Sequence, residues 1–206
     1  TCVDSDDYLT DDAIAQILIA WRKIPNDCIG ILAYKREKNN ILTKCTDNNI
    51  EKGTLRYLYE HGVSGDTVLI FKADILKKFM FPQFPGEKFV PEAYLYDLMD
   101  QEGRLFLLRK AIYVCEYLED GYTSGMAKLL YNNPQGYFCY INQRLNLDTK
   151  IKQRFADSIR YDAMAIAHRK KSVIKNAVYP FWAAVAFPAG WLFFKKRYAC
   201  YRKMKE

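Results

Sequence analysis

Three aspartates, Asp4, Asp6 and Asp7, lie close together near the start of the chain, just before an expected helix. Neighbouring carboxylates repel one another and lose solvation when buried, so a packed core has no use for them. They become favourable around Mg²⁺ or Mn²⁺, because these ions take oxygen ligands and often keep a phosphate as another ligand. The spacing of Asp4 and Asp6 lets two carboxylates reach one ion. A solvated turn that caps the helix fits equally well, and the spacing alone leaves both interpretations open.

A second acidic motif contains Glu87 and Glu92 and follows an irregular, aromatic-rich stretch at 79–90. Pro91 suits a first helical position, which would put Glu92 in the first turn of a helix over 91–99. A carboxylate there can take a proton from a hydroxyl group, or it can simply stabilise the helix N-terminus. The aromatic residues could form a platform for sugar rings or fill a core, and the sequence leaves this open.

The composition indicates a folded protein with anionic partners. The chain has 206 residues, half of them hydrophobic, which excludes disorder and allows one sizeable domain or one domain with an appendage. The net charge of +7 is concentrated after Thr149 and indicates phosphorylated substrates, nucleic acid or an acidic membrane face. The six cysteines are widely spaced, and neither His61 nor His168 has a partner at metal-ligand spacing. With no signal peptide visible, we expect reduced thiols in a cytosolic compartment.

Strands and helices alternate along the part of the chain that must position the acids. Apolar runs predict strands over 28–34, 67–71, 104–108 and 111–118. Helical spacing predicts helices capped by Thr10, over 54–61, 73–79, 91–99, 123–131 and 134–147, and a long one over 150–176 capped by 148–149. The fold class is therefore α/β, followed by a helical, basic C-terminal extension.

The segment 178–194 is uncharged and lies between Arg169-Lys170-Lys171 and Lys195-Lys196-Arg197. It is shorter than the roughly 20 residues that a membrane-spanning helix needs, and two prolines interrupt it. Aromatic ends and basic flanks are typical of an interfacial or re-entrant segment on an anionic membrane face. A helix packed on the domain is the alternative.

Four elements, taken in order, resemble the family 2 glycosyltransferases of the GT-A fold, of the type that builds bacterial capsule or other surface polysaccharides. Residues 3–9, Val-Asp-Ser-Asp-Asp-Tyr-Leu, resemble the family's metal-binding DxD element. Residues 65–72 look like the strand that follows in bacterial members, 86–92 like the acidic motif with the general base, and 117–123 like the next strand and turn. The resemblance covers residues 2–147.

The resemblance implies an inverting, metal-dependent transfer of a sugar from a nucleotide-sugar donor to a saccharide or lipid-linked acceptor. It implies Mn²⁺ or Mg²⁺ bound by Asp6, with Asp4 helping through the metal or the donor ribose. Asp7 would orient the donor site or cap the next helix. Glu92 is the implied general base and Glu87 the alternative, since the family's Glu-Asp pair reads Glu92-Ala93 here.

The resemblance also implies a division into a partial catalytic domain over 1–147 and a basic extension over 148–206, and a peripheral location at the inner face of the cell membrane. The family's N-terminal nucleotide-binding half has no counterpart in this sequence, so we expect residues 1–206 by themselves to bind donor poorly. Two other hypotheses stay open: a metal-dependent phosphoryl or nucleotidyl transferase, and a non-catalytic module that docks on membrane. No nucleic-acid partner is expected, because basic and aromatic residues do not interleave regularly.

Overall fold

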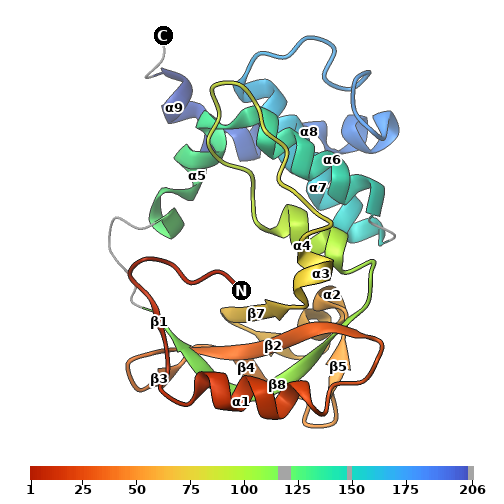
Figure 1. Ribbon diagram of the computed structural model, residues 1–206. Coiled ribbons are helices and arrows are strands. Elements are labelled where there is room, and N and C mark those ends of the chain that lie inside the picture. The colour runs from red at the N-terminus through yellow and green to blue at the C-terminus, as the bar shows by residue number, and fades with distance from the viewer. Residues whose placement is uncertain (116–121, 148–149, 204–206) are drawn as a thin grey trace. The chain divides into compact units, whose positions relative to one another are not determined.

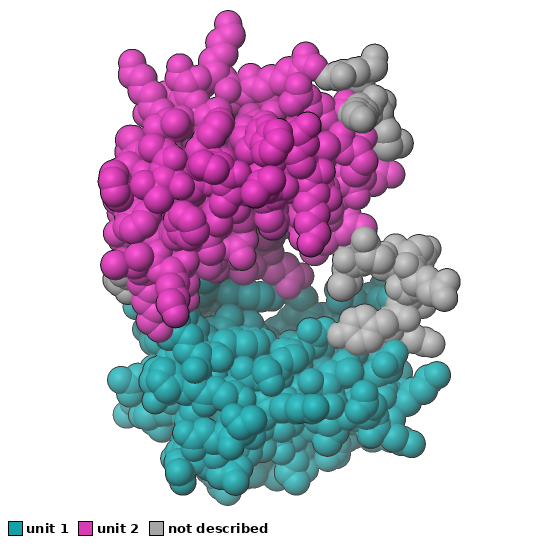
Figure 2. Space-filling view, turned by 180° about the vertical axis from the view of Figure 1, so that it is seen from behind, with its two compact units in different colours: residues 1–80, 95–119 teal, residues 81–94, 120–206 magenta. Residues whose placement is uncertain are grey.

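The computed structural model describes residues 1–115, 122–147 and 150–203 (Figure 1). The chain divides into two compact units, which are coloured separately in Figure 2. Unit 1 consists of Thr1–Met80 and Leu95–Glu119, and unit 2 of Phe81–Tyr94 and Asp120–Glu206. The sequence predicts a boundary between a catalytic part, 1–147, and a basic extension, 148–206. The two compact units are not divided there, and the functional boundary stays a prediction. The expected turn at 119–121 and the cap at 148–149 lie outside the described residues.

Unit 1 is built on a mixed sheet whose two long central strands run parallel. Strand β2 (Cys28–Glu37) pairs in parallel with β8 (Arg104–Val114), and every other strand of this sheet pairs antiparallel with one of these two. Strands β3 (Asn40–Ile41) and β7 (Thr67–Phe71) pair with β2, and β1 (Tyr8–Leu9) and β5 (Lys52–Gly53) pair with β8. Strands β4 (Lys44–Cys45) and β6 (Val63–Ser64) form a separate pair. The α/β class is thereby confirmed.

Helix α1 (Ala13–Trp21) packs along one face of the sheet (Figure 1). Side chains alternate between the two faces of a strand, and Ile31 and Ala33 of β2 are both buried against this helix. Gly30 lies on the opposite face, where a Cβ atom would collide with the backbone of β7 at Ile70. The helix begins after Asp12, two residues later than a Thr10 cap predicts, and the Thr10 hydroxyl donates to the Asp12 carboxylate (2.8 Å).

Three shorter helices connect the strands. Helix α2 (Leu55–Glu60) confirms the helix predicted over 54–61, and Thr54 is its N-cap, with a side chain that accepts the Tyr57 N–H. The Asp100 carboxylate also accepts the N–H groups of Leu55 (2.5 Å) and Arg56 (3.0 Å), which satisfies further free donors at that helix end. Helices α3 (Ala73–Leu76) and α4 (Ala93–Met99) are shorter than predicted.

The prediction of two strands over 104–108 and 111–118 is wrong, because β8 runs unbroken from Arg104 to Val114. Its register with β2 shifts between Ala33 and Tyr34, so the polar pair Arg109-Lys110 forms a bulge and does not end the strand. The Arg109 side chain donates to the carbonyl oxygens of Asp47 (3.0 Å) and Ile50 (2.6 Å). The polar residues therefore hold a neighbouring loop while strand pairing continues.

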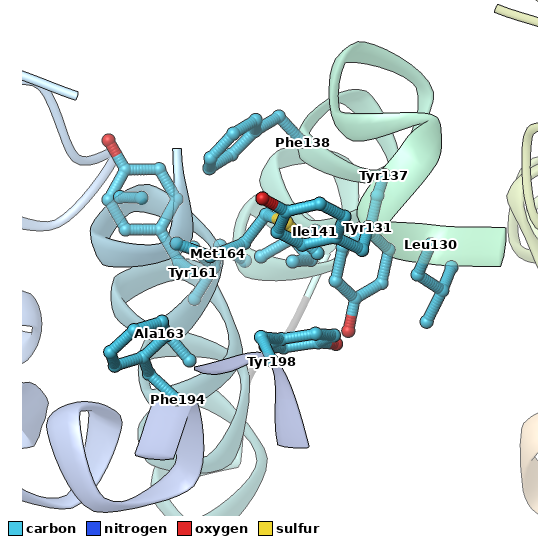
Figure 3. Packing of buried hydrophobic residues seen from close by; sticks show 13 residues of the cluster. Leu130, Tyr131, Tyr137, Phe138, Ile141, Tyr161, Ala163, Met164, Phe194 and Tyr198 are labelled. Carbon is cyan, nitrogen blue, oxygen red and sulfur yellow. The ribbon is translucent and has the colours of Figure 1, made fainter. Parts of the chain in front are cut away.

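Unit 2 is a group of helices around an aromatic core. Its helices are α5 (Tyr122–Asn132), α6 (Pro134–Leu147), α7 (Ile151–Ala167), α8 (Pro180–Arg197) and α9 (Ala199–Lys203). Figure 3 shows Phe138 of α6, Tyr161 of α7 and Tyr198, the residue between α8 and α9, gathered around Met164 and Ile141. The rings of Phe138 and Tyr161 meet edge to face, with centroids 5.5 Å apart, a favourable geometry for aromatic pairs. The predicted helices over 123–131 and 134–147 are confirmed.

Helix α7 ends at Ala167 rather than at 176 as predicted. Arg169 has a positive φ of 50°, and the N–H groups of Arg169 and Lys170 bond back to Ile166 and Ala165. This hydrogen-bond pattern terminates a helix, and the residue with positive φ in it is usually glycine. Because the residue here is arginine, the helix end could not be predicted from the sequence. Ile151, the first residue of α7, is exposed.

The apolar segment 178–194 forms most of α8, which packs against α7 through small residues. Ala183, Ala186 and Gly190 are buried on this side, and a Cβ atom at Gly190 would lie 2.6 Å from Cβ of Asp162. Pro188 lies inside the helix. Across the described ranges, the structure contains no helix with both the length and the apolarity to cross a membrane.

Asp162 lies fully buried in α7, beside Gly190 of α8. Both of its carboxylate oxygens lack a hydrogen-bond partner among the described residues. Burial disfavours the charged form and raises the pKa of Asp162 to about 7. The side chain is therefore tolerated mainly as the neutral acid.

Because Asp162 is buried without a hydrogen-bond partner in the described part of the chain, we expect it to lower the stability of the protein as the pH rises. The pKa is higher in the folded state than the ordinary value of 3.8, so the contribution of Asp162 to the unfolding free energy falls between about pH 4 and pH 7 and is then constant. The fall amounts to at most about 4 kcal/mol, since one pKa unit corresponds to about 1.4 kcal/mol. Urea unfolding of Asp162→Asn should show a much weaker pH dependence over this window, whereas Asp74→Asn, at an exposed site, should follow the wild type. Identical pH profiles for Asp162→Asn and the wild type would contradict this assignment.

Candidate functional site

The three N-terminal aspartates lie in one tight turn, named here the acidic turn and comprising residues 4–7. The N–H of Asp7 donates to the carbonyl of Asp4 (3.1 Å), which closes a four-residue turn. Strand β1 begins at the next residue, Tyr8, and pairs with the last residues of β8. The acidic turn is therefore attached directly to the edge of the sheet in unit 1.

A buried tyrosine of β8 anchors the acidic turn. The hydroxyl of Tyr113 donates to Oδ2 of Asp7 (2.7 Å) and accepts the backbone N–H of Asp4 (3.1 Å). Tyr113 is only 1% exposed, and burial raises the pKa of its phenol, so the hydroxyl stays protonated and remains a donor. The ammonium group of Lys35 lies 4.3 Å from the centre of the Tyr113 ring.

The side chains of the acidic turn divide into two kinds. Asp7 is half-buried and holds the turn through Tyr113, whereas Asp4 and Asp6 are exposed. Two exposed carboxylates at this spacing supply hard oxygen ligands, which suit Mg²⁺ or Mn²⁺. Within the described ranges no three His, Cys, Asp or Glu side chains come together as a metal-binding group. An ion bound at the acidic turn would have to take its other ligands from water or from a bound phosphate group.

Glu92 lies in unit 2, exposed, in the turn that leads into α4. The N–H of Tyr94 bonds to the carbonyl of Pro91 (2.9 Å) and forms this turn. The sequence predicted that Pro91 and Glu92 form the first turn of this helix. In the structure the helix begins at Ala93, so both residues precede it. The Glu92 carboxylate thus lies at the surface beside the helix start.

Glu87, the alternative base, has a structural role at the start of α6. Its two carboxylate oxygens accept the N–H groups of Gln135 and Gly136, each at 2.8 Å. These donors lie in the first turn of the helix, where a negative charge is also favourable. The neighbouring loop is fixed as well, because the N–H of Lys88 donates to the side chain of Asn133 (2.8 Å).

The aromatic-rich stretch at 79–90 is irregular, as predicted, and lies partly against the helical core. Phe89 packs against the aromatic core of unit 2, and its carbonyl lies so close to Gly136 that a side chain there would collide with it. Met80 and Phe81 are exposed, the first to 80%. The stretch therefore combines core packing with exposed apolar groups.

The structure brings Asp4, Asp6 and Asp7 together and places Glu87 and Glu92 in the other unit. Tyr113 could not be recognised from the sequence as the anchor of the acidic turn, since its contacts join residues 106 and 109 positions apart. It also did not reveal Asn133, whose side chain links the loop before α4 to the α5–α6 junction. Among the described residues neither histidine belongs to a group of three potential metal ligands. His61 stacks on Tyr57, and the ring of His168 meets that of Tyr131 at a tilt.

Comparisons of this chain with protein-family models, with curated proteins and with solved structures gave no match. The class that the fold and the site themselves define is an α/β protein with a surface-exposed carboxylate turn anchored on its sheet.

The anchoring role of Tyr113 predicts that Tyr113→Phe destabilises unit 1. Phenylalanine keeps the ring but removes the donor to Asp7 and the acceptor for the Asp4 N–H. The expected loss is about 1–3 kcal/mol, since two hydrogen-bonding groups lose their shared partner at a buried position. Urea unfolding measures it, and Tyr8→Phe, at a 60% exposed position on β1, is the matched control. Equal stability of the two variants would show that the hydroxyl does not hold the turn.

Proposed function

We propose that this chain is part of an inverting, metal-dependent glycosyltransferase of the GT-A fold, similar to the family 2 enzymes of surface polysaccharide synthesis. The single observation that carries the proposal is the acidic turn, which presents Asp4 and Asp6 at the edge of a mixed sheet while Tyr113 fixes its backbone. A rigid backbone holds two carboxylates ready for an ion without burying them. A merely solvated turn would need no buried phenol beneath it.

The reaction transfers a sugar from a nucleoside diphosphate to an acceptor hydroxyl. Bound Mn²⁺ or Mg²⁺ would offset the charge that gathers on the diphosphate leaving group. Asp6 is the residue proposed to bind the ion directly, and Asp4 the residue that assists through the ion or the donor ribose. Asp7 serves this site by positioning it, because its carboxylate is bonded to Tyr113.

Glu92 is the proposed general base. It takes the proton of the acceptor hydroxyl as the oxygen forms its bond to the anomeric carbon and the bond from that carbon to the diphosphate breaks. Attack opposite the leaving group inverts the anomeric configuration. The exposed position of Glu92 supports this role over Glu87, whose two oxygens are already occupied by the N-terminus of α6.

Activity of the complete gene product tests the proposal. A panel of uridine, guanosine and thymidine diphosphate sugars is offered with Mn²⁺, and release of the nucleoside diphosphate is measured. Turnover should require the divalent ion and should fall at least about a hundredfold in Asp6→Ala and in Glu92→Gln, the usual scale for a lost catalytic group. Glu87→Gln should keep most of its activity but lose about 1–2 kcal/mol of stability, because a helix cap and its charge are weakened.

Different products separate the proposal from its alternatives. Release of pyrophosphate instead of a nucleoside diphosphate would identify a nucleotidyl transferase. Full activity in Asp6→Ala or in Glu92→Gln would overturn the assignment of that residue. A Glu92→Gln variant as unstable as Glu87→Gln would show that Glu92 too is a structural cap.

A further inference from the structure

Helix α8 has one face packed on α7 and one face of large apolar side chains open to solvent. Phe181, Val185 and Leu192 are 69%, 49% and 62% exposed and recur at helical spacing. Trp191, 46% exposed, widens the same side. We name these four residues the α8 face. Single exposed apolar residues are ordinary, but four along one helix mark a surface that binds something.

The basic residues near the α8 face indicate that its partner is negatively charged. Residues 163–206 carry ten Lys and Arg against one Glu, whereas residues 1–162 carry 21 Lys and Arg against 23 Asp and Glu. The whole positive excess of the chain therefore belongs to the segment that contains α8. At the C-terminal end of the face Lys195 and Lys196 are exposed, and the ammonium of Lys195 lies 5.1 Å from the centre of the Trp191 ring.

More cations lie on the chain that leads into the helix. Lys171 and Lys175 are exposed, and Ile174 between them is 37% exposed. Apolar side chains are thus preceded and followed along the chain by lysines, with no acidic residue between 163 and 203 to counter them. An interfacial helix has this composition: apolar and aromatic groups enter the headgroup boundary while lysines contact lipid phosphates.

We propose that the α8 face docks this protein on an anionic lipid surface, with α8 lying in the plane of the interface. The helix of 18 residues is about 27 Å long at 1.5 Å per residue and packs on α7 along one side, so it can enter the headgroup region only with its other side. A second copy of the chain is a poorer occupant, because it would bring the same excess of cations to the contact. The inference is independent of the proposed enzymatic function.

Vesicle binding of the full chain tests the docking surface. The probes are phosphatidylcholine vesicles with and without phosphatidylglycerol, and the readouts are co-sedimentation and the fluorescence of the tryptophans. The wild type should bind the anionic vesicles with a blue shift and should bind pure phosphatidylcholine at least about tenfold more weakly, because each basic residue near the surface adds to the attraction. Raising the salt concentration should weaken the binding.

Two variants and one control decide whether the α8 face is responsible. Phe181→Glu with Leu192→Glu should abolish the binding and the blue shift, and Lys195→Ala with Lys196→Ala should weaken it about tenfold or more. The matched control is Ile14→Glu with Leu18→Glu on α1, which places the same charges at positions 60% and 55% exposed and should leave binding unchanged. Circular dichroism confirms that each variant folds.

Three outcomes would overturn the proposal. The first is equal binding to neutral and anionic vesicles. The second is undiminished binding of the folded Phe181→Glu, Leu192→Glu variant. The third is a wild-type dimer, seen by light scattering, that the same double substitution dissociates, because the α8 face would then be an interface between copies.

Discussion

The hydroxyl of Tyr113 lies where water does not reach it, so its hydrogen bonds must come from the protein. The acidic turn supplies both of them, one from the Asp4 amide and one to the Asp7 carboxylate. Tyr113 itself is fixed because β8 is held on one side by parallel pairing with β2 and on the other by β1. The geometry of the acidic turn thus depends on the centre of the sheet, although Asp4 and Asp6 themselves are at the surface.

Carboxylates in different environments of this protein have different roles. Asp7, Glu87 and Asp100 accept bonds from a phenol or from helix N-termini and hold the fold together. Asp162 is buried without a partner and is tolerated mainly when neutral. Asp6 and Glu92 are exposed on well-held backbone, which is the arrangement that chemistry on a ligand requires. Exposure separates Asp6 and Glu92 from Asp7, Glu87 and Asp162, whose side chains have structural environments.

A docked α8 would place unit 2, with Glu92, near a lipid surface. An acceptor carried on a lipid would then be concentrated where the proposed base lies. The docking proposal and the enzymatic proposal are supported by separate observations, the first by exposed apolar groups and cations in α8 and the second by the acidic turn. Either can fail without the other.

The sequence predicted correctly those helices and strands that are determined by neighbouring residues. The β-branched run of β7, the short helix α2 and the break between α5 and α6 all follow from neighbouring residues. The prediction from the sequence was wrong where a distant contact determines the structure. Arg109 was expected between two strands, but β8 continues through a bulge there because Arg109 bonds to the loop at 47–50. Arg169 ends α7 in a conformation usually left to glycine. For the site, the acids could be named from their spacing, but the Tyr113 anchor and the cap made by Glu87 are tertiary contacts without a local pattern.

The most direct test of the central claim is the binding of Mn²⁺ to the acidic turn, followed by electron paramagnetic resonance in the presence of uridine diphosphate. The complete gene product and an Asp11→Ala variant, which loses an exposed acid outside the turn, should both immobilise the ion. Asp6→Ala should leave the ion free in solution. Unchanged Mn²⁺ binding in Asp6→Ala would contradict the account, because the acidic turn would then be only a solvated loop.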